Sequence, residues 1–154
     1  MLKYIRKSIL DLPPSWLALF LVITWLQVRW FNPFGYDTPL INYVGWGLIG
    51  LGVALMFWAL MQFLALKTTV VPRNIPSAFI AKGPYRFSRN PIYLADTLVL
   101  LGFVLLVGSA LGVVLVPVFM ALIYHRFIKG EEAGLQAAFP EEYRAFAART
   151  RRWL

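Results

Sequence analysis

Residues 83–93 concentrate the groups in this chain that could bind a small polar molecule. They read Gly-Pro-Tyr-Arg-Phe-Ser-Arg-Asn-Pro-Ile-Tyr and lie between two long apolar blocks. Pro84 and Pro91 restrict the backbone near both ends, and Pro91 suits the first turn of a helix. Aromatic and guanidinium groups on such a restricted backbone can bind a partly charged ligand. The alternative is an ordinary loop with membrane-flanking arginines and interfacial tyrosines.

A second charged group, Glu131 and Glu132, follows two further apolar blocks that are joined by only Gly108 and Ser109. This pattern predicts a tight helical hairpin, which would bring its two ends back to one place. The residues gathered there would be Tyr85, Arg86, Arg89, Asn90, Tyr93, Tyr124, His125, Arg126, Glu131 and Glu132. With no cysteine and one histidine, the chain offers no thiolate nucleophile and no metal-ligand set. Such a site suits a zwitterionic ligand better than nucleophilic hydrolysis.

The composition is that of an integral membrane protein. Hydrophobic residues make up 60% of the chain and charged residues 14%, and the mean hydropathy is +0.67. At 154 residues, a single domain (1–154) is expected. The net charge of +8 comes from residues that flank apolar segments. It therefore indicates contact with lipid headgroups rather than with nucleic acid.

The predicted fold is an all-α membrane protein with about four transmembrane helices. The expected spans are 15–31, 40–66, 91–107 and 110–127, with a loop over 67–90 and a C-terminal helix over 129–150. Residues 45–50 match the dinucleotide pattern G-x-G-x-x-G. No strand is expected before them, so we predict no Rossmann fold and read these glycines as sites of close helix approach.

The segments outside the spans have simpler interpretations. Residues 1–14 read as a basic amphipathic lead that is retained before the first span, and 68–71 could form a brief extended piece. The last residues, Arg149, Arg151, Arg152 and Trp153, read as an anchor at the membrane surface.

The lysines and arginines predict the topology. All except Arg29 precede the first span, lie in the 67–90 loop, or lie at or beyond the end of the fourth span. By the positive-inside rule, both termini and the loop are expected in the cytoplasm. In a bacterial cell, the membrane that borders the cytoplasm is the inner membrane, and this is the location expected.

The order of these motifs resembles a known superfamily. Gly-Pro-Tyr-Arg-x-x-Arg-Asn-Pro-x-Tyr, then a hairpin, then Glu-Glu-x-x-Leu-x-x-x-Phe-x-x-x-Tyr is similar to the isoprenylcysteine carboxyl methyltransferases and phospholipid methyltransferases. The resemblance covers roughly residues 65–150, and Thr-Thr-Val-Val-Pro at 68–72 looks like the small bacterial members. It implies an S-adenosylmethionine-dependent methyltransferase embedded in the membrane.

The resemblance also implies roles for individual residues. The family's Arg-His-Pro-x-x-Tyr-like cofactor motif falls on Arg89, Asn90, Pro91 and Tyr93, and its acidic pair on Glu131 and Glu132. Many members have histidine where this chain has Asn90, and asparagine cannot shuttle a proton. The full cofactor-binding set expected is Tyr85, Arg86, Arg89, Asn90, Pro91, Tyr93, His125, Glu131 and Glu132. For His125, interfacial hydrogen bonding is the competing interpretation.

Arg89, Asp96 and Glu132 are the expected catalytic residues. Asp96 lies one helical turn beyond Tyr93 inside an apolar span, where carboxylates are functional candidates; a solvated interfacial aspartate is the alternative. The acceptor is expected to be a lipophilic molecule from the bilayer with a carboxylate, amine or thiol nucleophile. The competing functions are an NADPH-dependent reductase of the sterol-reductase type and a non-catalytic membrane scaffold.

Overall fold

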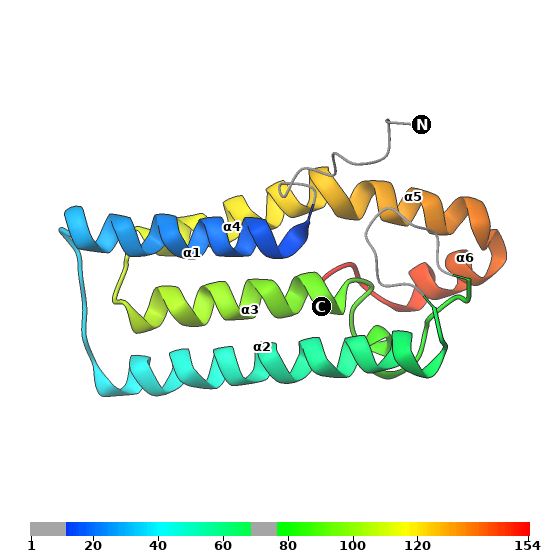
Figure 1. The fold of residues 1–154 in the computed structure, drawn as a ribbon, viewed down its shortest axis with the longest axis horizontal. Coiled ribbons are helices and arrows are strands. Elements are labelled where there is room, and N and C mark those ends of the chain that lie inside the picture. The colour runs from blue at the N-terminus through cyan, green and yellow to red at the C-terminus, as the bar shows by residue number, and fades with distance from the viewer. Residues whose placement is uncertain (1–11, 69–76) are drawn as a thin grey trace, which may run out of the picture.

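The computed structural model describes residues 12–68 and 77–154, and these residues form an all-helical bundle (Figure 1). The long helices are α1 (Pro13–Trp30), α2 (Pro39–Ala65), α3 (Pro91–Leu106) and α4 (Gly112–Ile123). The shorter elements are the 3-10 turn η2 (Gly83–Arg86), the π-helical η3 (Tyr124–Ile128), α5 (Lys129–Ala138) and α6 (Pro140–Arg149). Helix accounts for 76% of the chain, and the described part contains no strand. The all-α class is therefore confirmed.

Prolines mark where the helices begin. Pro13, Pro39, Pro91 and Pro140 each occupy the first turn of α1, α2, α3 and α6. A proline there costs no hydrogen bond, because the first amide groups of a helix have no partner within the helix. At Pro140 the same residue type also ends α5, so the C-terminal helix expected over 129–150 is two helices.

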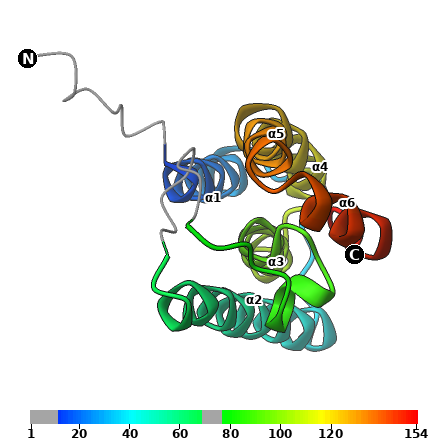
Figure 2. The ribbon, with the colours of Figure 1, turned by 90° about the vertical axis from the view of Figure 1, so that its right-hand side faces the viewer.

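Helix α3 is the centre of the molecule. It lies between α2 on one side and α1 and α4 on the other (Figure 2). Gly45 and Gly52 of α2 face α3, where a Cβ atom would lie 2.9 Å from the Gly102 carbonyl oxygen and 2.8 Å from that of Ala95. Only glycine permits this close approach, whereas Gly47 and Gly50 have no neighbouring atoms within 4 Å. Close helix approach was expected at Gly45, Gly47, Gly50 and Gly52, and it occurs at Gly45 and Gly52.

The predicted hairpin forms through a turn at residues 107–111. Gly108 has a positive φ of 65°, which favours glycine, and its carbonyl oxygen accepts hydrogen bonds from the Tyr36 amide at 3.3 Å and from Asn32 Nδ2 at 3.3 Å. Ser109 Oγ donates to Gln27 Oε1 of α1. The turn, the end of α1 and the 31–38 loop are therefore fastened together at one end of the bundle.

Helix α4 does not stop where the fourth span was expected to end. It continues through η3 into α5, so that Gly112–Ala138 is one helical segment of 27 residues. No proline interrupts it after Pro117, and the π-helical stretch at Tyr124–Ile128 shifts the register between its apolar and charged parts. Glu131 and Glu132 consequently lie on the same continuous helical segment as the core residues of α4.

Two helices are long and apolar enough to cross a membrane, Pro39–Ala65 and Gly112–Ala138. At 1.5 Å per residue, the 16 residues of α3 reach only about 24 Å, compared with a hydrocarbon core of about 30 Å. The structure thus supports association with a membrane, while the expected set of four spans stays a prediction.

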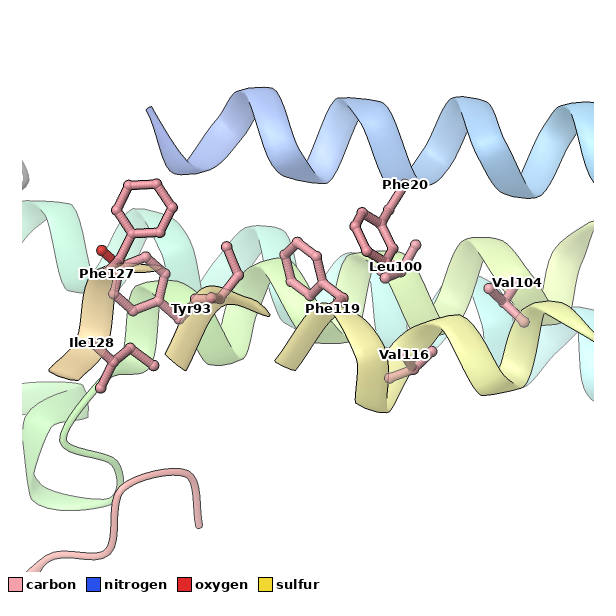
Figure 3. Close-up of a cluster of buried hydrophobic side chains, with 9 residues drawn as sticks. Phe20, Tyr93, Leu100, Val104, Val116, Phe119, Phe127 and Ile128 are labelled. Carbon is pink, nitrogen blue, oxygen red and sulfur yellow. The ribbon is translucent and has the colours of Figure 1, made fainter. Parts of the chain in front are cut away.

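The main core joins α1, α3 and the α4–η3 segment. Its buried residues are Phe20, Tyr93, Leu100, Val104, Val116, Phe119, Ile123, Phe127 and Ile128 (Figure 3). Phe20 and Phe119 meet edge to face, with ring centroids 5.2 Å apart, an arrangement that contributes about 0.5–1.5 kcal/mol beyond area burial. Tyr93 stacks with Phe127 at 6.3 Å and so connects this core to the polar end of α3.

Two sequence expectations fall outside the described residues. The amphipathic lead over 1–14 lies almost entirely there, and so does most of the extended piece over 68–71. Of the surrounding 67–90 loop, η2 and the residues that flank it are described, and they pack against α2.

Candidate functional site

The motifs that are separated in sequence meet at the end of the bundle opposite the 107–111 turn. The 83–93 segment leads into α3, the 131–132 pair lies on α5, and residues 150–153 follow α6 back toward the start of α3 (Figures 1 and 2). Hydrogen bonds join all three segments. We call the residues that make these bonds the polar cluster: Ser88, Arg89, Asn90, Tyr93, Glu131, Glu132, Tyr143 and Arg152.

Glu132 is the centre of the polar cluster. Its carboxylate receives Nε and Nη2 of Arg152 at 3.0 and 2.8 Å, and Asn90 Nδ2 at 3.5 Å. Arg89 Nη1 lies 3.6 Å from Oε1. The side chain of Glu132 is 13% exposed. Two cations and an amide thus compensate for its removal from water.

These partners decide the ionisation of Glu132. Burial by itself would raise the pKa of the carboxyl group, but the hydrogen bonds from Arg152 and the charge of Arg89 outweigh it and hold the pKa below its usual value. The hydrogen bond to Glu132 in turn raises the pKa of Arg152. Glu132 is therefore a carboxylate at neutral pH.

The other acidic residue, Glu131, binds the first turn of α3. Its Oε1 accepts a hydrogen bond of 2.7 Å from the Tyr93 hydroxyl. Tyr85 of η2 is buried, and this burial, together with the negative charge of Glu131, raises the pKa of its phenol. The two tyrosines are therefore neutral hydroxyl groups, and the ring of Tyr93 stacks on Phe127 of the main core.

Ser88 and Asn90 form the polar entrance to α3. Asn90 precedes Pro91, which is fully buried. The backbone N–H of Asn90 donates to Ser88 Oγ at 3.1 Å. Asn90 Nδ2 also donates to the carbonyl oxygen of Arg152 at 3.2 Å. Asn90 therefore serves as a double donor that ties α3 to α5 and to the C-terminal residues.

Arg89 lies between the polar cluster and a small aromatic cavity. Its Nη1 donates to the Tyr143 hydroxyl at 3.3 Å, whereas its Nε is buried without a hydrogen-bond partner among the described residues. The cavity has a volume of about 50 Å³. Its lining consists of Phe63, Phe79, Ile80, Tyr85, Arg89, Leu135 and Phe146. Arg89 thus offers a cationic donor to an otherwise apolar space.

The structure places two expected site residues at the surface instead of in the polar cluster. Arg86 is exposed at the end of η2, and no described hydrogen bond or ion pair connects it to the cluster. His125 is also exposed, with its ring 5.0 Å from that of Tyr124. Their cofactor-binding roles stay predictions.

Asp96 lies one turn deeper in α3 than Tyr93 and is 3% exposed. Residues three apart share a helix face, so Asp96 follows Tyr93 toward the interior. Its Oδ2 has no hydrogen-bond partner within the described chain. The burial argues against a solvated interfacial aspartate, and a buried oxygen without a donor is a costly arrangement that often marks function.

Three members of the polar cluster were absent from the residues expected in the site. Tyr143 ends the acidic motif, so its place in that motif was an available signal. Ser88 lies inside the 83–93 segment. Arg152 was assigned to a membrane anchor because it ends a basic tail, yet it binds Glu132, and Trp153 packs against the main core. No periodicity in residues 150–153 indicates that they fold back onto α3 and α5.

The chemistry of the cluster is that of a binding site for a polar small molecule with both charges. Carboxylates, guanidinium groups, an amide and tyrosine hydroxyls lie together at the end of an apolar bundle. No group of three potential metal ligands occurs in the described parts of the chain. The fold and this cluster define an all-helical, membrane-associated protein with a charged site at one end.

The comparisons with known proteins identify the family. The profile described as "Phospholipid methyltransferase" matches residues 40–142, which is more than half of the chain and contains Arg89, Asn90, Tyr93 and the Glu131–Glu132 pair. The chain therefore belongs to the phospholipid methyltransferase family. This confirms the resemblance inferred from the motifs, and membership of a methyltransferase family supports an enzyme that acts on membrane-associated substrates.

A relative from Haemophilus influenzae, named "Uncharacterized protein", is 36% identical over 63 residues, which span 41% of this chain and 100% of that protein. No solved structure matches the chain.

Proposed function

We propose that the protein transfers a methyl group from S-adenosylmethionine to a lipophilic acceptor in the membrane. The observation that carries this proposal is the convergence of Arg89, Asn90 and Tyr93 on the Glu131–Glu132 pair. A family motif that is split by a hairpin forms one charged site, in a chain that belongs to a methyltransferase family.

The donor set fits the polar parts of this cofactor. A guanidinium forms paired hydrogen bonds with a carboxylate, so Arg89 would bind the carboxylate of the methionine part. Glu131 and Glu132 would hold its ammonium group or the ribose hydroxyls. Tyr85 and Tyr93 would pack against the adenine or the sulfonium, where a neutral aromatic face attracts a cation. Because Arg86 is exposed, the carboxylate is assigned to Arg89.

The bound cofactor supplies an activated methyl group on a sulfonium sulfur. The chain has then to align the acceptor with that methyl and exclude water, since orientation and desolvation supply much of the rate in such displacements. The aromatic residues around Arg89 would exclude water. Asp96, buried on the face of α3 that carries Tyr93, would accept the proton that an amine or thiol acceptor loses.

The acceptor would enter from the bilayer. The apolar faces of α2 are exposed over most of their length, and the polar cluster lies at the end of the same bundle. A molecule with a lipid tail could therefore place its head at the site without leaving the membrane. Its reacting atom would be a carboxylate oxygen, an amine nitrogen or a thiol sulfur. We place the site, with both termini, on the cytoplasmic side of a bacterial inner membrane because basic residues gather there.

Calorimetric titration of the detergent-purified protein with S-adenosylmethionine and S-adenosylhomocysteine tests the proposal. We expect saturable binding that Arg89→Ala weakens about tenfold or more, because one charge-assisted interaction is lost. Arg144→Ala is the matched control, since Arg144 is an exposed arginine of α6 outside the polar cluster. Equal affinities of the two variants would remove Arg89 from the site.

The same titration separates the competing functions. Binding of NADPH instead of S-adenosylmethionine would favour the reductase, and binding of neither by the folded protein would favour a scaffold. A positive result would be followed by incubation with radiolabelled S-adenosylmethionine and lipid extracts. Asp96→Asn should lower turnover more than cofactor affinity, and unchanged turnover would exclude Asp96 from the reaction.

A further inference from the structure

Residues 150–153, which follow α6, lie across the polar cluster, and we call them the C-terminal strap. The Arg89 amide donates to the Arg151 carbonyl oxygen at 2.9 Å. The Arg152 carbonyl oxygen accepts from Asn90 Nδ2 and from Ser88 Oγ, both at 3.2 Å. Thr150 is buried at the start of the strap. The strap thus binds segment 88–90, which contains Arg89, the residue proposed to bind the cofactor's carboxylate.

The guanidinium of Arg152 binds the Glu132 carboxylate, which is also the group proposed to bind the cofactor. Nε of Arg152 contacts both oxygens of Glu132, at 3.0 and 3.2 Å, and Nη2 contacts Oε2 at 2.8 Å. Asn90 adds a donor to Oε1. A carboxylate accepts about four hydrogen bonds, so Glu132 has almost its full set of donors from the chain itself. An ammonium or hydroxyl group could bind Glu132 only by replacing one of them.

The space at the site leads to the same conclusion. The cavity beside Arg89 holds about 50 Å³, whereas sites for small molecules enclose about 300–1,000 Å³. The strap and α3 are held in different ways. The strap is not helical, its Arg152 side chain is 36% exposed, and Trp153 packs against the main core from a half-buried position. Helix α3 instead contributes Tyr93, Leu100 and Val104 to that core.

We propose that the C-terminal strap closes the site before the cofactor binds, and that Arg152 occupies the position on Glu132 that the cofactor's ammonium or ribose hydroxyl takes. This inference rests on the proposed function. Cofactor binding then exchanges one charge-assisted interaction of Glu132 for another, while the carboxylate keeps a donor throughout. The exchange moves the strap off Ser88 and Asn90. Arg152 acts on binding through Glu132 and is not a catalytic residue.

Removal of the Arg152 charge tests this exchange. In Arg152→Gln the closed form loses its main contact, so the binding-competent fraction rises and the apparent affinity with it. We expect S-adenosylhomocysteine to bind at least about threefold more tightly than to the wild type. Arg151→Gln, which removes the neighbouring exposed charge, should leave the affinity unchanged. Equal or weaker binding by Arg152→Gln than by Arg151→Gln would overturn the proposal.

A thiol reporter tests the movement itself. The chain has no cysteine, so Thr150→Cys introduces a single thiol at a position that is 4% exposed. Saturating S-adenosylhomocysteine should accelerate its reaction with a water-soluble maleimide, and an unchanged or slower reaction would overturn the proposal. The Arg152→Gln titration decides the matter independently if the reporter protein does not fold. Absence of binding by the folded wild type would refute the proposed function, whereas binding without strap movement would refute only this inference.

Discussion

Asn90 is the residue whose two donor hydrogens join three segments. Its Nδ2 contacts Glu132 and the Arg152 carbonyl, so replacement by aspartate removes the donor and places a second negative charge beside Glu132. We expect Asn90→Asp to destabilise the protein by about 1–3 kcal/mol. The measurement is thermal unfolding in detergent.

Asn42→Asp is the matched control for this substitution. Asn42 Nδ2 also donates to a carboxylate, that of Asp37 at 2.9 Å, but the pair is exposed. Its cost should stay within about 0.5 kcal/mol. A loss of similar size in the two variants would show that Asn90 makes no special contribution to the cluster.

Glu132 makes the stability of the polar cluster depend on pH. Its pKa is lower in the folded protein than in the unfolded chain, because Arg152 and Arg89 favour the carboxylate. The unfolded chain therefore binds a proton first as the pH falls, and stability decreases below about pH 4.5. The contribution is complete above that range.

Thermal unfolding between pH 3 and pH 7 checks this dependence. The wild type should lose more stability on acidification than Glu132→Gln, which has no proton to gain at this position. Glu142→Gln, at an exposed position on α6, should follow the wild type. Parallel curves for the wild type and Glu132→Gln would contradict the assignment of the lowered pKa.

At the scale of single residues, the sequence predicted which side chains would lie close together better than it predicted their contacts. Arg89, Asn90, Tyr93 and the acidic pair meet because a hairpin returns its ends to one place, and that follows from the apolar blocks alone. Arg86 and His125 have equally suitable side chains, but the direction in which each points depends on η2 and η3. Neither the 3-10 turn nor the π-helical register shift has a periodicity that a sequence reader can detect.

Among the helices, the α2–α3 contact gives the clearest prediction. Gly52→Ala would place a Cβ atom 2.8 Å from the Ala95 carbonyl oxygen, and Gly45→Ala one 2.9 Å from that of Gly102. Backbone atoms cannot move aside as flexible side chains can, so each substitution should destabilise the protein by about 1–3 kcal/mol. Thermal unfolding in detergent or bicelles gives the values.

Gly47→Ala and Gly50→Ala are controls on the same helix. Both positions have open space around them, and alanine is a better helix former by up to about 1 kcal/mol. These variants should be neutral or slightly more stable. A cost as large as that at Gly45 and Gly52 would mean that another surface packs on this side of α2.

Helix existence was predictable, and helix ends were predictable where proline marks them. The strong apolar blocks with Pro39 and Pro91 identify α2 and α3 within a few residues, whereas the break at Pro140 divides what was expected as one helix over 129–150. The continuity of α4 with α5 was not apparent, since the change from apolar to charged residues at Lys129 looks like a boundary although the backbone remains helical. A change in residue composition shows that the surroundings of a helix change, but it does not show where the helix ends.

For the molecule as a whole, the arrangement predicts which parts share a side of the membrane. Lys82 and Leu154 belong to the end that carries the polar cluster, whereas Asp37 lies in the loop fastened to the opposite turn. Single cysteines at positions 82 and 154 should therefore react with an impermeant maleimide from one side, and a cysteine at 37 from the other. Intact cells and inverted vesicles distinguish the sides. Labelling of all three from one side would contradict a bundle that crosses the bilayer.

The fastening of the 107–111 turn has a consequence for motion. Gly108 binds Tyr36 and Asn32, and Ser109 binds Gln27, so α1, α3 and α4 are tied at that end by loops and side chains together. At the other end, segments far apart in the sequence meet mainly through side-chain contacts, with one backbone hydrogen bond from Arg89 to Arg151. Opening fluctuations should then pivot about the tied end and widen toward the polar one. Amide hydrogen exchange would show a gradient along α3, slowest near Val104 and fastest near Tyr93.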